Sequence, residues 1–290
     1  MKLIWKFNLG LAGIFVIGFV LCAAISYAVL QANARDEILD NARVMMESAM
    51  SVRAYTDSQV RPLLETQLKY TFLPQSVPFY AATEHFNDLR KKYPDYSYKE
   101  AALNPTNPRD RAADWEADLV NRFRNDPALP EISGQRDTPT GAALFLARPI
   151  QIKDPGCIAC HSTAAAAPKT LVDLYGSANG FGWKVNDIIG AQIVSVPVAL
   201  PTQRANHTFW VFLLLLTVVF AATFVLLNLM LQTMVIRPVK ELSRLADEVS
   251  LGHRESAEFT SRSKDEIGVL AGALSRMNKS LVQAIKMLEE

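Results

Sequence analysis

The chain has 290 residues, a formal net charge of +1, and a composition that is 50% hydrophobic and 20% charged. This length suits one soluble domain together with membrane segments, and it is too short for two large soluble domains. A net charge so close to zero argues against a nucleic-acid-binding protein, because such proteins concentrate a strong excess of Lys and Arg on one face.

Two apolar stretches carry no Asp, Glu, Lys or Arg, over residues 7–34 and 205–236. Both are long enough to cross the hydrocarbon core of a bilayer as helices. We therefore predict transmembrane helices over residues 9–30 and 208–231.

Basic residues lie beyond the two predicted spans, at Lys2, Lys6, Arg237, Lys240 and Arg244. Because Lys and Arg are retained in the cytoplasm, both termini are expected there, with residues 1–8 as the N-terminus and 287–290 as the C-terminal end. Residues 31–207 then form a periplasmic domain of a two-pass protein in the bacterial inner membrane. The alternative is a signal peptide cleaved near residues 32–34, but the apolar run over 9–30 exceeds the roughly 7 to 15 residues typical of one.

Gly and Pro divide the periplasmic segment. Neither occurs between Gly18 and Pro62, which predicts one continuous helix. Its packed stripe is expected to comprise Ile38, Ala42, Met45, Ala49, Val52 and Thr56. Thirteen of the fifteen prolines lie between Pro74 and Pro201, so the rest of this domain is expected to be α+β, with strands near residues 142–149 and 188–198.

Two heptad stretches follow the second span, separated by a polar connector that contains Gly252. The second stretch opens with Asp-Glu-Ile-Gly at residues 265–268. With Pro238 before the first heptad, this order resembles a HAMP linker, the cytoplasmic relay of bacterial membrane sensors, which we expect over residues 232–286. Neither helix can bury its apolar stripe alone, so a parallel homodimer is expected. A plain juxtamembrane coiled coil is the alternative, although it would have little use for the break.

The motif CIACH, at residues 157–161, predicts a covalently attached haem. The thiols of Cys157 and Cys160 are spaced to add across the two vinyl groups of one haem c, and His161 follows as the axial ligand of the iron. A disulfide would leave His161 unexplained, and a structural zinc site would need further ligands. A thioredoxin-type pair would need a βαβ context, which the sequence does not show here.

No motif gives the second axial ligand. Met50 and Met46 lie four residues apart on one flank of the long helix and are the candidates, with Met45 or His85 behind them. An open distal position that binds NO, CO or O2 is equally allowed.

Several stretches resemble the PAS-like, haem-c-binding sensor domains found outside the membrane in bacterial, including cyanobacterial, signalling proteins. They are VRAYT at 52–56, VRPLL at 60–64, ARPI at 147–150, the CxxCH, YG at 175–176, GFGW at 180–183, and GAQ with VSVP within 190–197. The resemblance implies a PAS-like sheet with the haem between sheet, loop and first helix. It also implies a cysteine as second axial ligand in one member, and no further cysteine occurs in this segment, so another group is expected to replace it.

These features predict a membrane-bound c-type haem sensor that detects redox state or a diatomic gas and relays it through a HAMP dimer. Because the sequence ends at Glu290, soon after the second heptad helix, we expect a separate cytoplasmic signalling output protein. The alternative is a membrane-anchored c-type cytochrome that transfers electrons to a redox partner. A haem enzyme is not expected, because adjacent residues such as Glu84 and His85 seldom face one pocket as a distal acid–base pair.

Overall fold

The computed structural model describes residues 3–139, 141–251, 259 and 265–289. The chain forms two compact units, Ser26–Phe209 on the one hand and Met1–Ile25 with Trp210–Glu290 on the other. The predicted cytoplasmic Lys2, the connector at Gly252 and the last residue, Glu290, lie outside the described residues.

A long helix, α1 (Leu3–Tyr55), enters the unit formed by Ser26–Phe209 and continues as a π-helical turn, η1 (Thr56–Val60), and a short helix, α2 (Arg61–Leu63). This confirms the continuous helix predicted from the absence of Gly and Pro. Within η1 and just before it, hydroxyl groups bond backwards to the carbonyls of the preceding turn, with Thr56 Oγ1 lying 2.8 Å from Val52 O. Such back-bonding bends or loosens helices.

Four antiparallel strands form the sheet of this unit, in the order β1-β4-β3-β2. They are β1 (Ser97–Ala102), β2 (Ile132–Thr138), β3 (Gly141–Gln151) and β4 (Ile188–Pro197). The predicted strands correspond to β3 and β4, so the α+β class is confirmed. β1 contains two adjacent charged residues, Lys99 and Glu100, and β2 is a polar edge strand, which is why neither was predicted.

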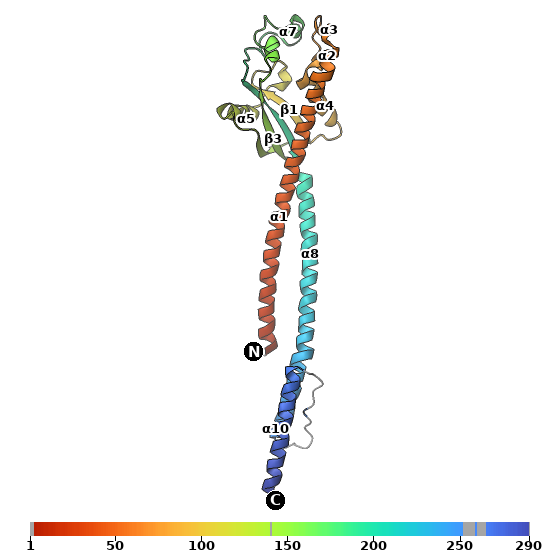
Figure 1. Cartoon of the computed structure of the whole chain (residues 1–290), viewed down its shortest axis with the longest axis vertical. Coiled ribbons are helices and arrows are strands. Elements are labelled where there is room, and N and C mark those ends of the chain that lie inside the picture. The colour runs from red at the N-terminus through yellow and green to blue at the C-terminus, as the bar shows by residue number, and fades with distance from the viewer. Residues whose placement is uncertain (1–2, 140, 252–258, 260–264, 290) are drawn as a thin grey trace. The chain divides into compact units, whose positions relative to one another are not determined.

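One face of the sheet packs on α1 and on α4 (Pro78–Leu89). The core on this side comprises Ile38, Ala42, Met46, Ala49, Ala82, Phe86, Tyr98, Leu144, Leu146, Val194 and Val196. The stripe predicted on α1 is therefore largely correct, and Met46 joins it as a fully buried residue. Figure 1 shows α1 and α4 on this side of the strands.

The opposite face packs on α5 (Asp114–Asn125), whose Leu119, Val120 and Phe123 contact Ala101, Ala147, Ala191 and Ile193. The polypeptide between β3 and β4 carries η4 (Pro155–Cys157), α6 (Ile158–His161) and α7 (Lys169–Tyr175). Three further short helices complete the unit: α3 (Glu65–Leu68), η2 (Pro74–Ser76) and η3 (Pro108–Asp110). Because this segment joins the end of β3 to the start of β4, the CxxCH motif lies at that end of the sheet.

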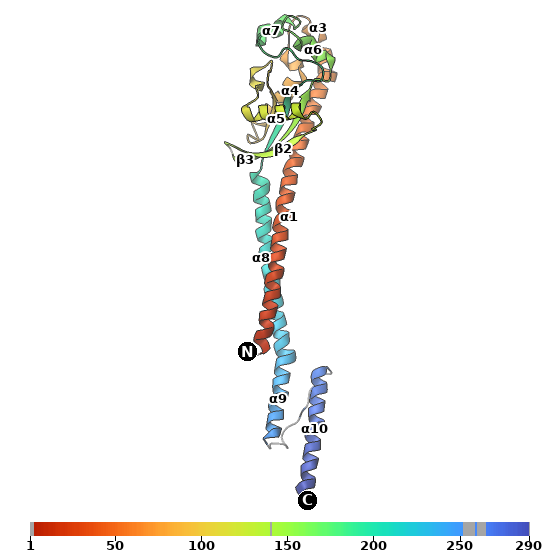
Figure 2. The same cartoon turned by 90° about the vertical axis from the view of Figure 1, so that its left-hand side faces the viewer.

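The second unit is helical. It contains α8 (Ala199–Met230) from Trp210 onward, which leads through η5 (Leu231–Ile236) into α9 (Arg237–Ser250), and α10 (Glu266–Glu289). In Figure 2, α9 and α10 lie beside each other and run in the same direction. Leu242, Val249, Phe259 and Ala271 form a small core in this part.

Two helical segments are long and apolar enough to cross a membrane, Ile4–Leu63 and Pro201–Ser250. Their most apolar windows are 0% buried, so these side chains face away from the protein interior. The phenyl rings of Phe15 and Phe220 lie 5.1 Å apart within this unit. The two segments contain the spans predicted over residues 9–30 and 208–231.

Candidate functional site

The residues of the CxxCH motif lie on two consecutive helical turns, η4 and α6, and the residues just before the motif favour the start of the first turn. Asp154 caps the first turn, since its carboxylate accepts a hydrogen bond of 2.8 Å from the amide of Gly156, and Pro155 occupies the first position of η4. Cys157 ends η4, while Cys160 and His161 belong to α6. The two cysteines are three residues apart in helical conformation and therefore lie on the same side of the turn.

The surroundings of the cysteines are apolar. Cys157 and Ile158 pack against a buried cluster of Ile150, Ile152 and Ile189, which Phe79 and Trp183 extend. Neither cysteine forms a disulfide. Burial raises the pKa of the Cys157 and Cys160 thiols above the ordinary value, although the nearby Arg61 opposes this shift. Reactive disulfide-exchange pairs need the opposite, a lowered thiol pKa, so the apolar surroundings of Cys157 and Cys160 do not favour a thioredoxin-type pair.

The imidazole of His161 is held by hydrogen bonding at Nδ1 and by ring stacking, and Thr106 Oγ1 also lies 3.4 Å from Nδ1. Its Nδ1 lies 2.7 Å from the carbonyl oxygen of Gly180, and because a carbonyl can only accept, Nδ1 carries the proton and Nε2 keeps its lone pair. The ring also stacks on the indole of Trp183, with centroids 4.0 Å apart and an interplanar angle of 13°. Burial lowers the pKa of His161, which favours the neutral imidazole that a metal ligand requires.

The loop over residues 180–183 holds this histidine in place. The amide of Trp183 donates to His161 O at 3.2 Å, and the amide of Gly182 donates to Ser162 O at 3.0 Å. Gly180 has a φ of +83°, and a Cβ built on it would lie 2.1 Å from Thr106 Oγ1, so only glycine fits there. The sequence identified this loop only as part of a resemblance, and its role in orienting His161 was not predicted.

Buried polar residues lie between this site and the main core. The guanidinium carbon of Arg53 lies 3.6 Å from the ring centroid of Phe79, and Arg53 Nε is buried with no hydrogen-bond partner among the described residues. Glu100 is only 4% exposed, and its Oε2 likewise lacks a partner within the described part of the chain. Tyr98 donates to Glu100 Oε1 and accepts from Gln192 Nε2 at 3.3 Å.

Burial is the largest influence on the pKa values of Glu100 and Tyr98. It raises the pKa of Glu100 to about 8, although Arg53 and the hydroxyl of Tyr98 oppose the shift. Burial also raises the pKa of Tyr98 above its ordinary value, and the neighbouring Glu100 adds to that effect. The sequence did not predict that these residues form a buried polar group, because their burial depends on strand pairing between distant segments.

The two methionines predicted as second axial ligands lie on the C-terminal half of α1. Met46 is fully buried in the main core. The Sδ atom of Met50 accepts hydrogen bonds from Gln192 Nε2 at 3.5 Å and from Arg53 at 3.6 Å. His85 packs edge-on against the ring of its neighbour Phe86, with centroids 5.1 Å apart. The structure places neither methionine in the apolar cluster of Cys157, and the second axial ligand stays a prediction.

Comparison with known proteins gives one family and one solved structure. The family model described as Tll0287-like, Tll0287, matches residues 31–197, more than half of the chain. A crystal structure of the cyanobacterial haem protein Tll0287 is 19% identical, with a TM-score of 0.43, and the match covers 56% of this chain and 95% of that chain. A search of curated proteins gave no match. The chain belongs to the Tll0287-like family.

Proposed function

We propose that this chain is a membrane-anchored c-type haem sensor, with one haem c attached through Cys157 and Cys160 and its iron bound by His161. The observation that carries the proposal is the state of His161. A neutral imidazole with Nδ1 committed to Gly180 O at 2.7 Å leaves Nε2 to bind iron, one residue after the second thiol. Proximal histidines of metal sites are oriented in this way by a hydrogen bond from the other ring nitrogen.

The rest of the site fits the group. Two thiols on one face of a helical turn can form thioether bonds, and the cluster of Ile150, Ile152 and Ile189 supplies an apolar wall. The orphaned Nε of Arg53 is a buried cationic donor beside Phe79, which packs on the same cluster. Membership in the Tll0287-like family, whose namesake is a cyanobacterial haem protein, supports haem binding.

Haem c, when bound, supplies one-electron exchange and, at an open position, binding of NO, CO or O2. The residues of the chain set the conditions for this chemistry. Trp183 stacks on His161 and limits rotation of the ring, and the Gly180 carbonyl strengthens the imidazole as a donor. The apolar side chains around Cys157 keep water away and thereby raise the energetic cost of added charge.

The sensing role rests on the helices that come after the second candidate span. On α10, Leu270 is 43% exposed, Met277 50% and Leu281 43%, so the described residues leave an apolar stripe of this helix uncovered. We propose that α9 and α10 form a HAMP-like parallel homodimer in the cytoplasm, which buries this stripe. The haem domain would lie in the periplasm of an inner-membrane protein, and a separate cytoplasmic protein would receive the signal.

Absorption spectra of the purified full chain test haem attachment. We expect a haem that resists acid–acetone extraction in the wild type and in Cys22→Ser, and none retained in Cys157→Ser/Cys160→Ser. Cys22 is the matched control because it is the third free cysteine and belongs to the other unit. Complete extraction of haem from the wild type would refute the proposal.

An electron-transfer cytochrome is the second candidate. It is favoured by the partial exposure of Cys157 and Cys160, which are intermediate in burial and would leave a haem edge open to a redox partner. Spin labels on α10 separate the two functions. A sensor predicts that the distance between labels in the dimer changes on reduction or on addition of NO or CO, and unchanged distances under all three conditions favour the electron carrier.

A further inference from the structure

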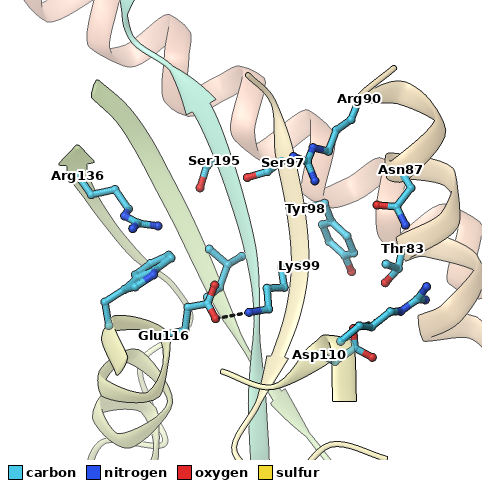
Figure 3. A pocket seen from close by; sticks show the side chains of 13 residues that line it. Thr83, Asn87, Arg90, Ser97, Tyr98, Lys99, Asp110, Glu116, Arg136 and Ser195 are labelled. Carbon is cyan, nitrogen blue, oxygen red and sulfur yellow. Dashed lines mark hydrogen bonds and ion pairs between the residues drawn. The ribbon is translucent and has the colours of Figure 1, made fainter. Parts of the chain in front are cut away.

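A cavity of about 380 Å³ lies beside β1, lined by residues of α4, β1, η3, α5, β2 and β4 (Figure 3). It belongs entirely to the unit formed by Ser26–Phe209. Helix α5 packs on the part of the sheet around Ala101, Ala147 and Ala191. Ser97 of β1 and Ser195 of β4, four residues along each strand from Ala101 and Ala191, line the opening. Its lining does not include Cys157, Cys160 or His161.

Part of the charge in this cavity is already neutralised. Lys99 Nζ donates to Glu116 Oε2 at 2.6 Å and to the carbonyl of Arg111 at 2.8 Å. Arg109 pairs with Glu84 and lies 3.6 Å from the carboxylate of Asp110. These cations and carboxylates therefore leave little free charge for a ligand.

Two further arginines line the cavity without a carboxylate partner. Within the described residues, neither Arg90 nor Arg136 forms an ion pair. The guanidinium of Arg136 stacks on the indole of Trp115, with its carbon 3.9 Å from the ring centroid. Stacking fixes the plane of the guanidinium and leaves its N–H edge free, which is the arrangement that binds a carboxylate or phosphate through two parallel hydrogen bonds.

Between the two arginines lie two hydroxyl groups. Ser97 of β1 and Ser195 of β4 are direct cross-strand partners, and Figure 3 shows both between Arg136 and Arg90. Ser195 is only 7% exposed and, with Gln192, is one of two buried polar residues in β4. Neither hydroxyl is hydrogen-bonded within the part of the chain that the structure describes. Because neither hydroxyl is engaged by the protein, each can donate or accept a hydrogen bond with a molecule bound in the cavity.

From this arrangement we propose that the cavity is a binding site for a small organic dianion with an acidic group at each end. Arg136 binds one acidic group, Arg90 binds the other, and the hydroxyls of Ser97 and Ser195 bond to polar atoms between them. Ile193 and Trp115 also line the cavity, and their apolar surfaces favour a short carbon chain over inorganic phosphate. The same periplasmic domain would then receive a second chemical input besides the one at His161.

Calorimetric titration of the full chain in detergent tests the site, with glutarate and succinate as probes. We expect saturable binding of at least one dicarboxylate below about 10 mM, as for other sites with two charged contacts. Arg136→Gln and Arg90→Gln are each expected to weaken binding by at least about tenfold. Arg136→Lys keeps the charge but loses the planar fork, so we expect intermediate binding.

Control variants and control ligands distinguish binding in the cavity from nonspecific attraction between charges. Arg122→Gln removes an exposed arginine of α5 outside the cavity and is expected to leave binding unchanged. Butyrate, with one acidic group, and putrescine, a dication of similar length, are expected not to bind. No saturable binding of either dicarboxylate overturns the proposal. Undiminished binding to the Arg90→Gln/Arg136→Gln variant also overturns it, as does equally tight binding of inorganic phosphate.

Discussion

The substitution Glu100→Gln tests the buried polar group beside the candidate haem site. The pKa of Glu100 is raised from 4.5 to about 8, so the folded protein holds a proton that the unfolded chain releases at lower pH. Stability from this group is therefore fully present below about pH 4.5 and is lost as the pH rises through about 8. The groups that face Glu100 are Tyr98 on β1, Gln192 on β4, Arg53 on α1 and Asp110 on η3.

The difference between the two pKa values, about 8 and 4.5, is 3.5 units. At about 1.4 kcal/mol per unit this corresponds to a loss of up to about 5 kcal/mol of unfolding free energy between acidic and alkaline pH. Movement of Arg53 toward the carboxylate would reduce this value. The variant Glu100→Gln has no proton to lose, so we expect a flatter profile and greater stability than the wild type above about pH 8.

Urea unfolding of the full chain in detergent, followed by far-ultraviolet circular dichroism, measures this effect at about pH 5, 7 and 9. Glu116→Gln is the matched control, because Glu116 is also buried but is paired with Lys99 at 2.6 Å. The control should lose stability but keep the wild-type dependence on pH. A wild-type profile that stays level over this range, or a slope that persists in Glu100→Gln, would refute the reasoning.

Three further substitutions test the site and the core. Gly180→Ala should displace the loop that holds His161, because its Cβ would lie 2.7 Å from the backbone Cα of Thr106 at a φ of +83°; we expect a changed haem spectrum that Thr106→Ala does not restore, and an unchanged spectrum would contradict the role of this loop. Trp183→Leu removes the stacked ring at 4.0 Å and should broaden the electron paramagnetic resonance signal of the haem while the covalent attachment persists; an unchanged signal would contradict a positioning role. Phe123→Ala empties a fully buried position under the sheet and should cost about 3 to 5 kcal/mol in urea unfolding, with a loss under about 1 kcal/mol contradicting the core assignment.

Local patterns in the sequence predicted the long helix, β3 and β4, since a lack of Gly and Pro and runs of apolar residues act over neighbouring positions. The strands β1 and β2 were missed because β1 contains Lys99 and Glu100 and β2 is polar, and their pairing depends on partners far along the chain. The motif predicted which atoms could hold haem. Its support by Gly180 could not be derived, because residues 161 and 180 meet only after the loop closes.

Ala42, Met46 and Ala49 have no exposed surface on the C-terminal half of α1, and all three press on the same face of the sheet. Turning the helix by one residue, about 100°, would expose all three at once and lose their packing. Rotation of α1 against the sheet is therefore strongly opposed, whereas a small shift or tilt of helix and sheet together leaves every contact intact. A movement of α1 that begins at Arg53, four residues beyond Ala49, would consequently displace the helix and the sheet together as one rigid body.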